Sequence, residues 1–340
     1  MTDNLNGIPG PEEPVCDAWQ RALQVTFGIF FVAVTIILVY YEGPRASDED
    51  LQAQVHQLSG QVERLKQEEA MPAMVLNRYR DSICYVFGIY RVGFPGRKPS
   101  FRARISGSGF VVANGLLATN RHVAEPWYED AESTALIAKG ATPQLEKLLA
   151  FFPGRSTPVN ITPLAWTAEG DLAILQIDDS EAVRQLRPLP FADTPATPGE
   201  IVTVIGYPMG ILGMLAKAPP AVYERLALRN DDQRAADELA ALSLIRPSAT
   251  CGHLGDVVGE KLVYDAPTAH GGSGGPVFDS HGKVIGINSA YIDGFSGGTL
   301  GIAVEALSPL IDAARKHQLQ YARLNSPAQK VSLSTAIARP

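Results

Sequence analysis

The stretch of sequence that decides the fold runs from Asp265 to Pro276 and reads Asp-Ala-Pro-Thr-Ala-His-Gly-Gly-Ser-Gly-Gly-Pro. It places Ser273 between two pairs of glycines. Glycine permits backbone conformations that other residues rarely adopt, and it lets a second chain approach the main chain closely. An isolated Gly-rich turn with a serine is usually only a turn. The stretch therefore indicates chemistry only if the rest of the chain supplies the serine with partners.

Two earlier motifs supply such partners. One runs from Ala118 to Val123 and contains His122, and the other runs from Glu169 to Leu175 and contains Asp171. A serine hydroxyl is a poor nucleophile near neutral pH, so it needs a base within hydrogen-bond reach and a carboxylate that orients this base. We predict that Ser273 attacks, that His122 acts as base and then as acid, and that Asp171 orients His122.

The glycines around Ser273 also predict a site for developing negative charge. The backbone N–H groups of Gly271 and Ser273 would form an oxyanion hole, typically the largest electrostatic contribution to acyl transfer. The loop fits the G-x-S-x-G elbow of α/β-hydrolases as well, but in that fold the acid and the base follow the serine. Here His122 and Asp171 precede it. The elbow interpretation therefore fails.

Short apolar runs separated by turns dominate the chain from about residue 77 onward. Repeated strand–turn–strand patterns without regularly interleaved helices favour antiparallel barrels over a parallel sheet. Asn114-Gly115 predicts a two-residue hairpin turn with positive φ at both positions. Residues 143–152 and 219–244 fit no strand, and the second of these stretches reads as helical. The expected strands are Ile83–Val92, Ile105–Val112, Leu116–Thr119, Leu172–Ile177, Ile201–Ile205, Leu262–Tyr264, Val277–Phe278 and Val284–Ile287.

Taken together, the motifs resemble those of the two-barrel trypsin-like serine proteases. The HtrA (Deg) branch is the most similar, with T-N-x-H-V, then D-L-A-x-L, then D-A followed by G-x-S-G-G-P, and finally x-V-I-G-I-N, here Lys283–Asn288. The resemblance covers about residues 81–316. It implies an all-β fold of two six-stranded antiparallel barrels, a serine endopeptidase acting on unfolded or membrane-adjacent polypeptides, and no cofactor or metal.

The same resemblance suggests residues that contact substrate. The strand containing Ile287, Asn288 and Ser289 should form one wall of the primary specificity pocket, and His270 should border its entrance or be a plain loop residue. No acid lies near Pro267-Thr268, where one would select Arg or Lys. We therefore expect a small or medium apolar side chain before the scissile bond.

The sequence departs from the family pattern in three places. About 20 residues follow the last matching stretch, too few for the PDZ domain that HtrA proteins usually carry. Position 272 is glycine, whereas digestive enzymes have an aspartate there that pairs with a newly cut N-terminus. Activation by propeptide cleavage is therefore disfavoured, and ordering of loops, as in an oligomer, is the better hypothesis. Residues 219–244 form an insertion that would act as a lid or as a partner-binding helix.

An uncharged run from Ala22 to Tyr41 indicates a membrane anchor. Its twenty residues would span about 30 Å as a helix, the thickness of a hydrocarbon core. A cleaved signal peptide would begin with basic residues, whereas residues 1–20 contain four acidic residues and no Lys or Arg. We expect a single-pass inner-membrane protein with its protease domain in the periplasm or outside the cell, although Arg21 and Arg45 nearly balance and give little orientation.

A short heptad pattern follows the anchor. Apolar residues alternate spacings of four and three, as in a coiled coil. The pattern would serve as a solvated stalk or as a weak self-association device supporting a homotrimer. The residues are Leu51, Val55, Leu58, Val62 and Leu65. The expected division is an N-terminal tail (1–21), a transmembrane helix (22–41), a linker with a short coiled coil (42–77), a protease domain (78–318) and a C-terminal tail (319–340).

Composition excludes several classes of protein. The net charge of −7 opposes nucleic-acid binding, which needs a basic face. Three cysteines rule out a disulfide-stapled scaffold and a CxxC metal site. Cys84 and Cys251 would pair only if the fold brought them together. The alternative function is a catalytically idle, membrane-tethered peptide-binding scaffold, against which the complete triad argues.

Overall fold

The computed structural model describes residues 16–41, 48–128, 130–228, 231–291 and 298–324. The chain divides into two compact units, Met1–Leu65 and Lys66–Pro340. Predictions for residues 1–15, 42–47 and 325–340 lie outside the described residues. The second unit contains all of the described strands.

The first unit is helical. Helix α1 (Cys16–Tyr41) contains an apolar span, Trp19–Tyr41, that is long enough to cross a membrane, and no residue of its apolar window is buried. Helix α2 (Asp48–Tyr79) begins with three acidic residues, which favour the positive end of the helix dipole. The five heptad side chains lie on α2 and are all exposed. The coiled-coil pairing itself stays a prediction.

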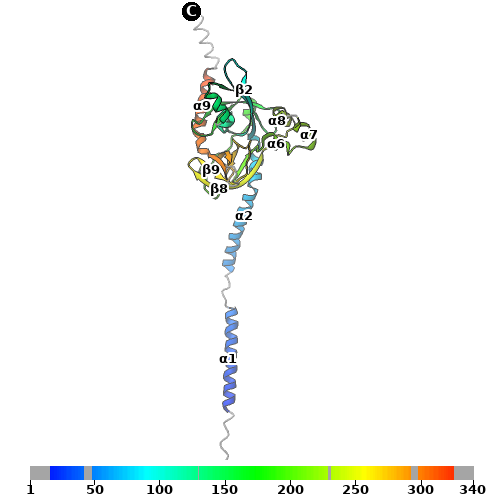
Figure 1. The fold of residues 1–340 in the computed structure, drawn as a ribbon. Coiled ribbons are helices and arrows are strands. Elements are labelled where there is room, and N and C mark those ends of the chain that lie inside the picture. Colours follow the sequence, from blue (N-terminus) through cyan, green and yellow to red (C-terminus); the bar gives the residue numbers. More distant parts are fainter. Residues whose placement is uncertain (1–15, 42–47, 129, 229–230, 292–297, 325–340) are drawn as a thin grey trace, which may run out of the picture. The chain divides into compact units, whose positions relative to one another are not determined.

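The second unit contains two closed barrels of six antiparallel strands each, which confirms the predicted fold class (Figure 1). The first has the strand order β1-β2-β3-β6-β5-β4 and the second β10-β11-β12-β9-β8-β7. The first barrel consists of β1 (Ile83–Gly93), β2 (Pro99–Ala113), β3 (Leu116–Thr119), β4 (Thr142–Phe151), β5 (Val159–Trp166) and β6 (Ala173–Ile177). The second consists of β7 (Ile201–Gly206), β8 (Ser248–Val258), β9 (Lys261–Tyr264), β10 (Pro276–Phe278), β11 (Val284–Tyr291) and β12 (Thr299–Ala303).

One hydrophobic cluster joins the two barrels. It contains Tyr85 and Phe110 from the first barrel and Ile205 and Ile287 from the second, together with Tyr207, which follows β7. The rings of Tyr85 and Tyr207 lie 5.7 Å apart, and the Tyr207 hydroxyl donates a hydrogen bond of 3.0 Å to the Ile83 carbonyl. Large aromatic side chains bury much apolar area. This cluster therefore holds the two barrels together.

The prediction that residues 143–152 form no strand is wrong. Strand β4 occupies Thr142–Phe151 and pairs with β1. Its first half alternates exposed and half-buried residues before four buried ones, and Glu146 on the polar face accepts from Arg102 at 2.7 Å. When one face of a barrel strand is exposed to solvent, charged side chains on that face obscure the alternation of apolar and polar residues in the sequence. Strands β5, β8 and β12 also lie outside the strands expected from the sequence.

The predicted hairpin between β2 and β3 is confirmed, but its turn differs from the one expected. Gly115 has a φ of +74°, whereas Asn114 does not have a positive φ. The register between the two strands shifts between Val111 and Ala113. This bulge changes the local twist, so the turn needs one left-handed residue instead of two.

Helices α6 (Gly210–Leu215), α7 (Pro220–Ala227) and α8 (Asp232–Ala241) follow β7 and lie together beside the barrels in Figure 1. The predicted helical character of residues 219–244 is confirmed by α7 and α8, whereas α6 precedes that stretch and was not predicted. Arg104 of β2 forms an ion pair of 3.0 Å with Asp232 at the start of α8. The insertion thus belongs to the second barrel by sequence and contacts the first. The predicted role as a lid or partner-binding helix stays untested.

The remaining helices of the second unit pack against the barrels or connect their strands. From Lys66 onward α2 belongs to this unit, where Met71 and Val75 are buried and the Tyr79 ring stacks on Phe278 at 5.6 Å. Helix α9 (Leu307–Leu324) packs against β5 and β6. It includes residues 319–324, which were expected to belong to the C-terminal tail. The short helices are α3 (Arg121–Ala124), α4 (Ala131–Ile137), α5 (Ser180–Gln185) and the 3-10 turns Arg80–Ser82 and Val304–Ala306.

Candidate active site

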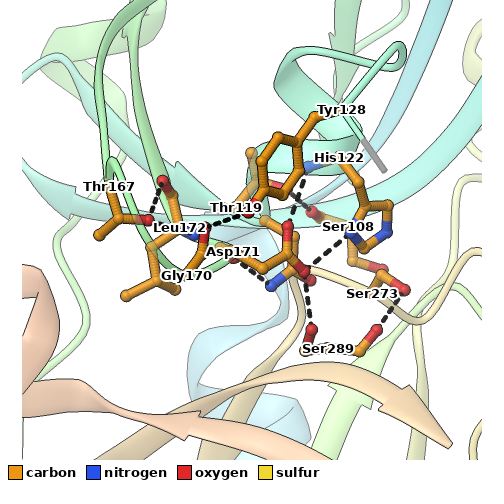
Figure 2. Close-up of polar contacts among 11 residues, drawn as sticks. Ser108, Thr119, His122, Tyr128, Thr167, Gly170, Asp171, Leu172, Ser273 and Ser289 are labelled. Atoms are coloured by element: carbon orange, nitrogen blue, oxygen red, sulfur yellow. Dashed lines mark hydrogen bonds and ion pairs between the residues drawn. The ribbon is translucent and has the colours of Figure 1, made fainter. Parts of the chain in front are cut away.

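The fold brings His122 and Asp171 into direct contact (Figure 2). His122 lies in α3, just after β3, and Asp171 lies just before β6, which pairs with β3. The His122 Nδ1 atom is 2.8 Å from Asp171 Oδ2, and the His122 backbone N–H donates to Oδ1 at 2.9 Å. Because a carboxylate only accepts, Nδ1 carries the hydrogen and Nε2 is left as an acceptor.

Further hydrogen bonds hold Asp171 in place. The Asn120 amide donates to the Asp171 carbonyl at 2.8 Å, and the Ser289 hydroxyl donates to Oδ2 at 2.7 Å. The Tyr128 hydroxyl donates to the neighbouring Gly170 carbonyl at 3.1 Å. The Asp171 side chain is 15% exposed and that of His122 is 30% exposed. Since a partly buried carboxylate needs hydrogen-bond donors, these contacts hold the Asp171 side chain in place and aim it at the imidazole.

Ser273 joins the same group of residues through Ser289. The Ser273 hydroxyl donates to the Ser289 carbonyl at 2.8 Å, and no hydrogen bond joins it to His122 in the described part of the chain. Ser289 lies where the pairing of β11 with β12 shifts, between Asn288 and Ala290. A bulge re-aims the unpaired residue. It turns the Ser289 hydroxyl toward Asp171 and its carbonyl toward Ser273, a role that the sequence did not predict.

The glycine loop leaves two amides free. Gly271 and Gly274 have φ values of +90° and +86°. The amides of Gly272, Gly274 and Gly275 donate to main-chain carbonyls, whereas those of Gly271 and Ser273 have no acceptor among the described residues. These are the two amides predicted to form the oxyanion hole. Their free N–H groups are consistent with that role.

The other predicted substrate residues have defined surroundings. The His270 carbonyl accepts from the Met209 amide at 2.7 Å. Ile287 lies in the hydrophobic core, and the buried Asn288 side chain accepts from the Tyr264 hydroxyl at 2.8 Å and donates to Thr268 at 3.2 Å. Ile287 and Asn288 are thus buried in the second barrel, and the specificity pocket that they would line stays a prediction. Contact of any of these residues with substrate stays a prediction.

The second unit contains two cysteines, Cys84 and Cys251. Cys84 is buried in β1, and burial raises the pKa of its thiol, which disfavours the reactive thiolate. Cys251 is exposed on β8. Both thiols are free, so the fold does not pair them.

We expect Gly274→Ala to destabilise the second unit strongly. An added Cβ would lie well inside contact distance of the Ser108 carbonyl and the Thr119 hydroxyl, at a φ of +86°. Strain and overpacking together should cost about 3 kcal/mol, or about 10 °C in the midpoint of thermal unfolding. The matched control is Gly259→Ala, with a φ of +61° and open space around it. Equal shifts for the two variants would contradict the tight packing at Gly274.

The family described as "Trypsin-like peptidase domain" matches residues 107–287, more than half of the chain and the whole region between the first glycine motif and β11. The chain belongs to this family. The prediction of a trypsin-like serine protease is therefore confirmed at the level of the family.

Similar proteins agree with this assignment. A "Probable periplasmic serine endoprotease DegP-like" from Rhizobium meliloti is 28% identical over 211 residues, covering 62% of this chain and 32% of the relative. A protein with the same description from Bartonella henselae is 28% identical over 200 residues, 58% of this chain and 30% of its own length. The predicted similarity to HtrA and Deg proteases is confirmed. The chain spans about a third of the length of these relatives.

Solved structures of two proteases resemble the chain at lower sequence identity. The Rv3671c protease from M. tuberculosis, in its active form, is 17% identical with a TM-score of 0.45, covering 71% of this chain and 83% of that one. The serine endoprotease from Yersinia pestis is also 17% identical with a TM-score of 0.45, covering 72% and 66%.

Proposed function

We propose that this chain is a membrane-anchored serine endopeptidase that uses Ser273, His122 and Asp171. The observation that carries the proposal is the hydrogen-bonded Asp171–His122 pair. It is linked through Ser289 to Ser273, which sits on a glycine loop in a chain of the trypsin-like family. Such a pair provides the oriented base that a serine nucleophile requires.

In the proposed reaction, the Ser273 Oγ atom bonds to the scissile carbonyl carbon while its proton passes to His122 Nε2. The carbonyl oxygen becomes an oxyanion and accepts from the Gly271 and Ser273 amides. When the C–N bond breaks, His122 gives the proton to the leaving amine, and an acyl-Ser273 ester remains. Water then attacks the ester with His122 as base, and the proton returns to Ser273 as the acid product leaves.

The first step requires Ser273 to change its hydrogen bond. Its hydroxyl donates to the Ser289 carbonyl in the structure, whereas attack requires it to donate to His122. Catalytic hydrogen bonds often tighten only when substrate is bound. An extended peptide that pairs with β11 at the bulge would compete for the Ser289 carbonyl and so release the hydroxyl toward His122.

The proposed substrates are unfolded or membrane-adjacent polypeptides, with a small or medium apolar side chain before the scissile bond. Helix α1 would hold the protease at the inner membrane, since no residue of its apolar window is buried against the rest of the chain. The DegP-like relatives are described as periplasmic, which supports a protease domain on the periplasmic or outer side.

Self-association through α2 is part of the proposal. The heptad side chains are exposed and would be buried in a coiled coil of several copies, with a homotrimer as the proposed state. A tether at the membrane raises the effective concentration of copies. A seam this short therefore does not need high intrinsic affinity.

The test uses membranes that carry the full chain. After an alkaline carbonate wash, the membrane pellet should cleave an added reduced and alkylated protein at internal bonds and release new amino termini. Membranes carrying Ser273→Ala at equal protein level should release none. Cleavage that persists in Ser273→Ala would contradict the assigned nucleophile, and activity that leaves with the wash would contradict the anchor.

A further inference from the structure

Ser108 lies under the glycine loop and uses every polar group it has. It belongs to β2 of the first barrel and is fully buried. Its N–H donates to the Ser273 carbonyl at 2.7 Å, and its carbonyl accepts from the Thr119 hydroxyl at 2.7 Å. Its hydroxyl donates to the Gly271 carbonyl at 2.7 Å and accepts from the Tyr207 N–H at 2.9 Å. One side chain thus ties the first barrel to two loops of the second.

The direction of the hydroxyl hydrogen is fixed by this arrangement. A serine hydroxyl has a single hydrogen to donate. Because the Tyr207 N–H occupies the oxygen as an acceptor, the hydrogen is directed at the Gly271 carbonyl. Among the described residues, Ser108 is the one donor to this carbonyl.

This bond sets a peptide plane next to the candidate oxyanion hole. The Gly271 carbonyl and the Gly272 N–H belong to one planar peptide. The carbonyl is held by Ser108 and the N–H donates to Ala269 at 2.9 Å, so the plane is fixed at both edges. The backbone of Ser108 fixes the Ser273 carbonyl in the same way. Ser108 therefore holds the carbonyl groups of Gly271 and Ser273, the two residues whose amides have no acceptor among the described residues.

Glycines of the second barrel lie in close contact with Ser108. Gly206 approaches so closely that a Cβ there would lie 2.8 Å from the Ser108 hydroxyl. A Cβ at Gly274 would overlap the Ser108 carbonyl. Because Ser108 is the one described donor to the Gly271 carbonyl, removal of its hydroxyl would leave that carbonyl without a donor among the described residues. The glycines of the loop would then no longer be confined to one conformation.

We propose that the Ser108 side chain is a positioning residue for the oxyanion hole, through its hydrogen bonds to the Gly271 carbonyl and the Tyr207 amide. This inference rests on the proposed function, since it concerns the same reaction. Small displacements of groups that stabilise the transition state affect the chemical step far more than ground-state binding. The side chain should therefore affect kcat and leave KM unchanged.

The test compares Ser108→Ala with Thr299→Val in the full chain, using a peptide ester or amide substrate. Thr299 also has a buried hydroxyl bonded to a main-chain carbonyl, that of Ala266 at 2.9 Å, and it lies in β12. We expect Ser108→Ala to lower kcat about 10²-fold at unchanged KM, and Thr299→Val to keep kcat. A peptide aldehyde, which needs the oxyanion hole, should bind Ser108→Ala about 10²-fold more weakly, whereas a product peptide should bind equally well.

Two results would overturn the inference while leaving the proposed function intact: wild-type kcat in Ser108→Ala, or an equal loss of kcat in Thr299→Val. If Ser108→Ala does not fold, Ser108→Cys is measured by the same criteria. A thiol is a weaker donor of similar size, so a reduced kcat at unchanged KM supports the inference and a wild-type kcat overturns it. Absence of hydrolysis by the wild-type chain overturns the proposed function and this inference together.

Discussion

His122→Ala is expected to lower kcat by about 10⁶ while substrate binding changes little. Without the imidazole, the Ser273 proton has no acceptor in the transition state, and its hydroxyl keeps its bond to the Ser289 carbonyl. Residual hydrolysis would come only from substrate binding and the oxyanion hole. The measurement is the steady-state rate on a chromogenic peptide, corrected for the amount of folded protein.

The matched control for this variant is His253→Ala. His253 is exposed on β8 of the second barrel. It should keep the wild-type rate, because it lies outside the Asp171–His122 pair. A loss of less than about tenfold in His122→Ala would show that another group accepts the proton, and the proposed role of His122 would be wrong.

Asp171→Asn is expected to lower kcat by about 10⁴. An amide in place of the carboxylate would donate to His122 Nδ1, which would move the ring hydrogen to Nε2 and remove the acceptor for Ser273. The variant should fold normally, since size is conserved and the Asn120 bond goes to the backbone carbonyl of residue 171. The measurement is kcat on the same peptide, with thermal unfolding as a check on folding.

Asp178→Asn provides the matched control for the charge change. This carboxylate is further along the same segment and accepts from Thr162 at 2.7 Å on the exposed surface. It should keep wild-type kcat. If Asp171→Asn retained more than a tenth of the rate, the carboxylate would not be setting the imidazole tautomer.

Short motifs allowed much of the candidate site to be predicted from the sequence. The motifs of His122, Asp171 and Ser273 are local, and each sets its own turn, strand end or loop. The two-barrel fold was predicted through the family resemblance carried by those motifs. The free amides of Gly271 and Ser273 likewise follow from glycines within a few residues of the serine.

Features that depend on register and on close approach between distant segments could not be predicted in this way. Ser289 reaches Asp171 because β11 shifts its pairing by one residue, and no local pattern marks that bulge. Ser108 meets the glycine loop because Gly206 and Gly274 let the chains approach. Strand β4 was missed for a different reason: its wet face carries charges that hide the alternation.

The most direct test of the account is labelling with a fluorophosphonate, which reacts only with an activated serine. Detergent-solubilised wild type, Ser273→Ala and Ser280→Ala would be treated in parallel and the labelled peptide identified by mass spectrometry. We predict one label on Ser273 in wild type and in Ser280→Ala, and none in Ser273→Ala. No label in the wild type, even with unfolded protein added, would contradict a competent triad and favour a peptide-binding scaffold. A label that persists in Ser273→Ala would show that the nucleophile is another residue.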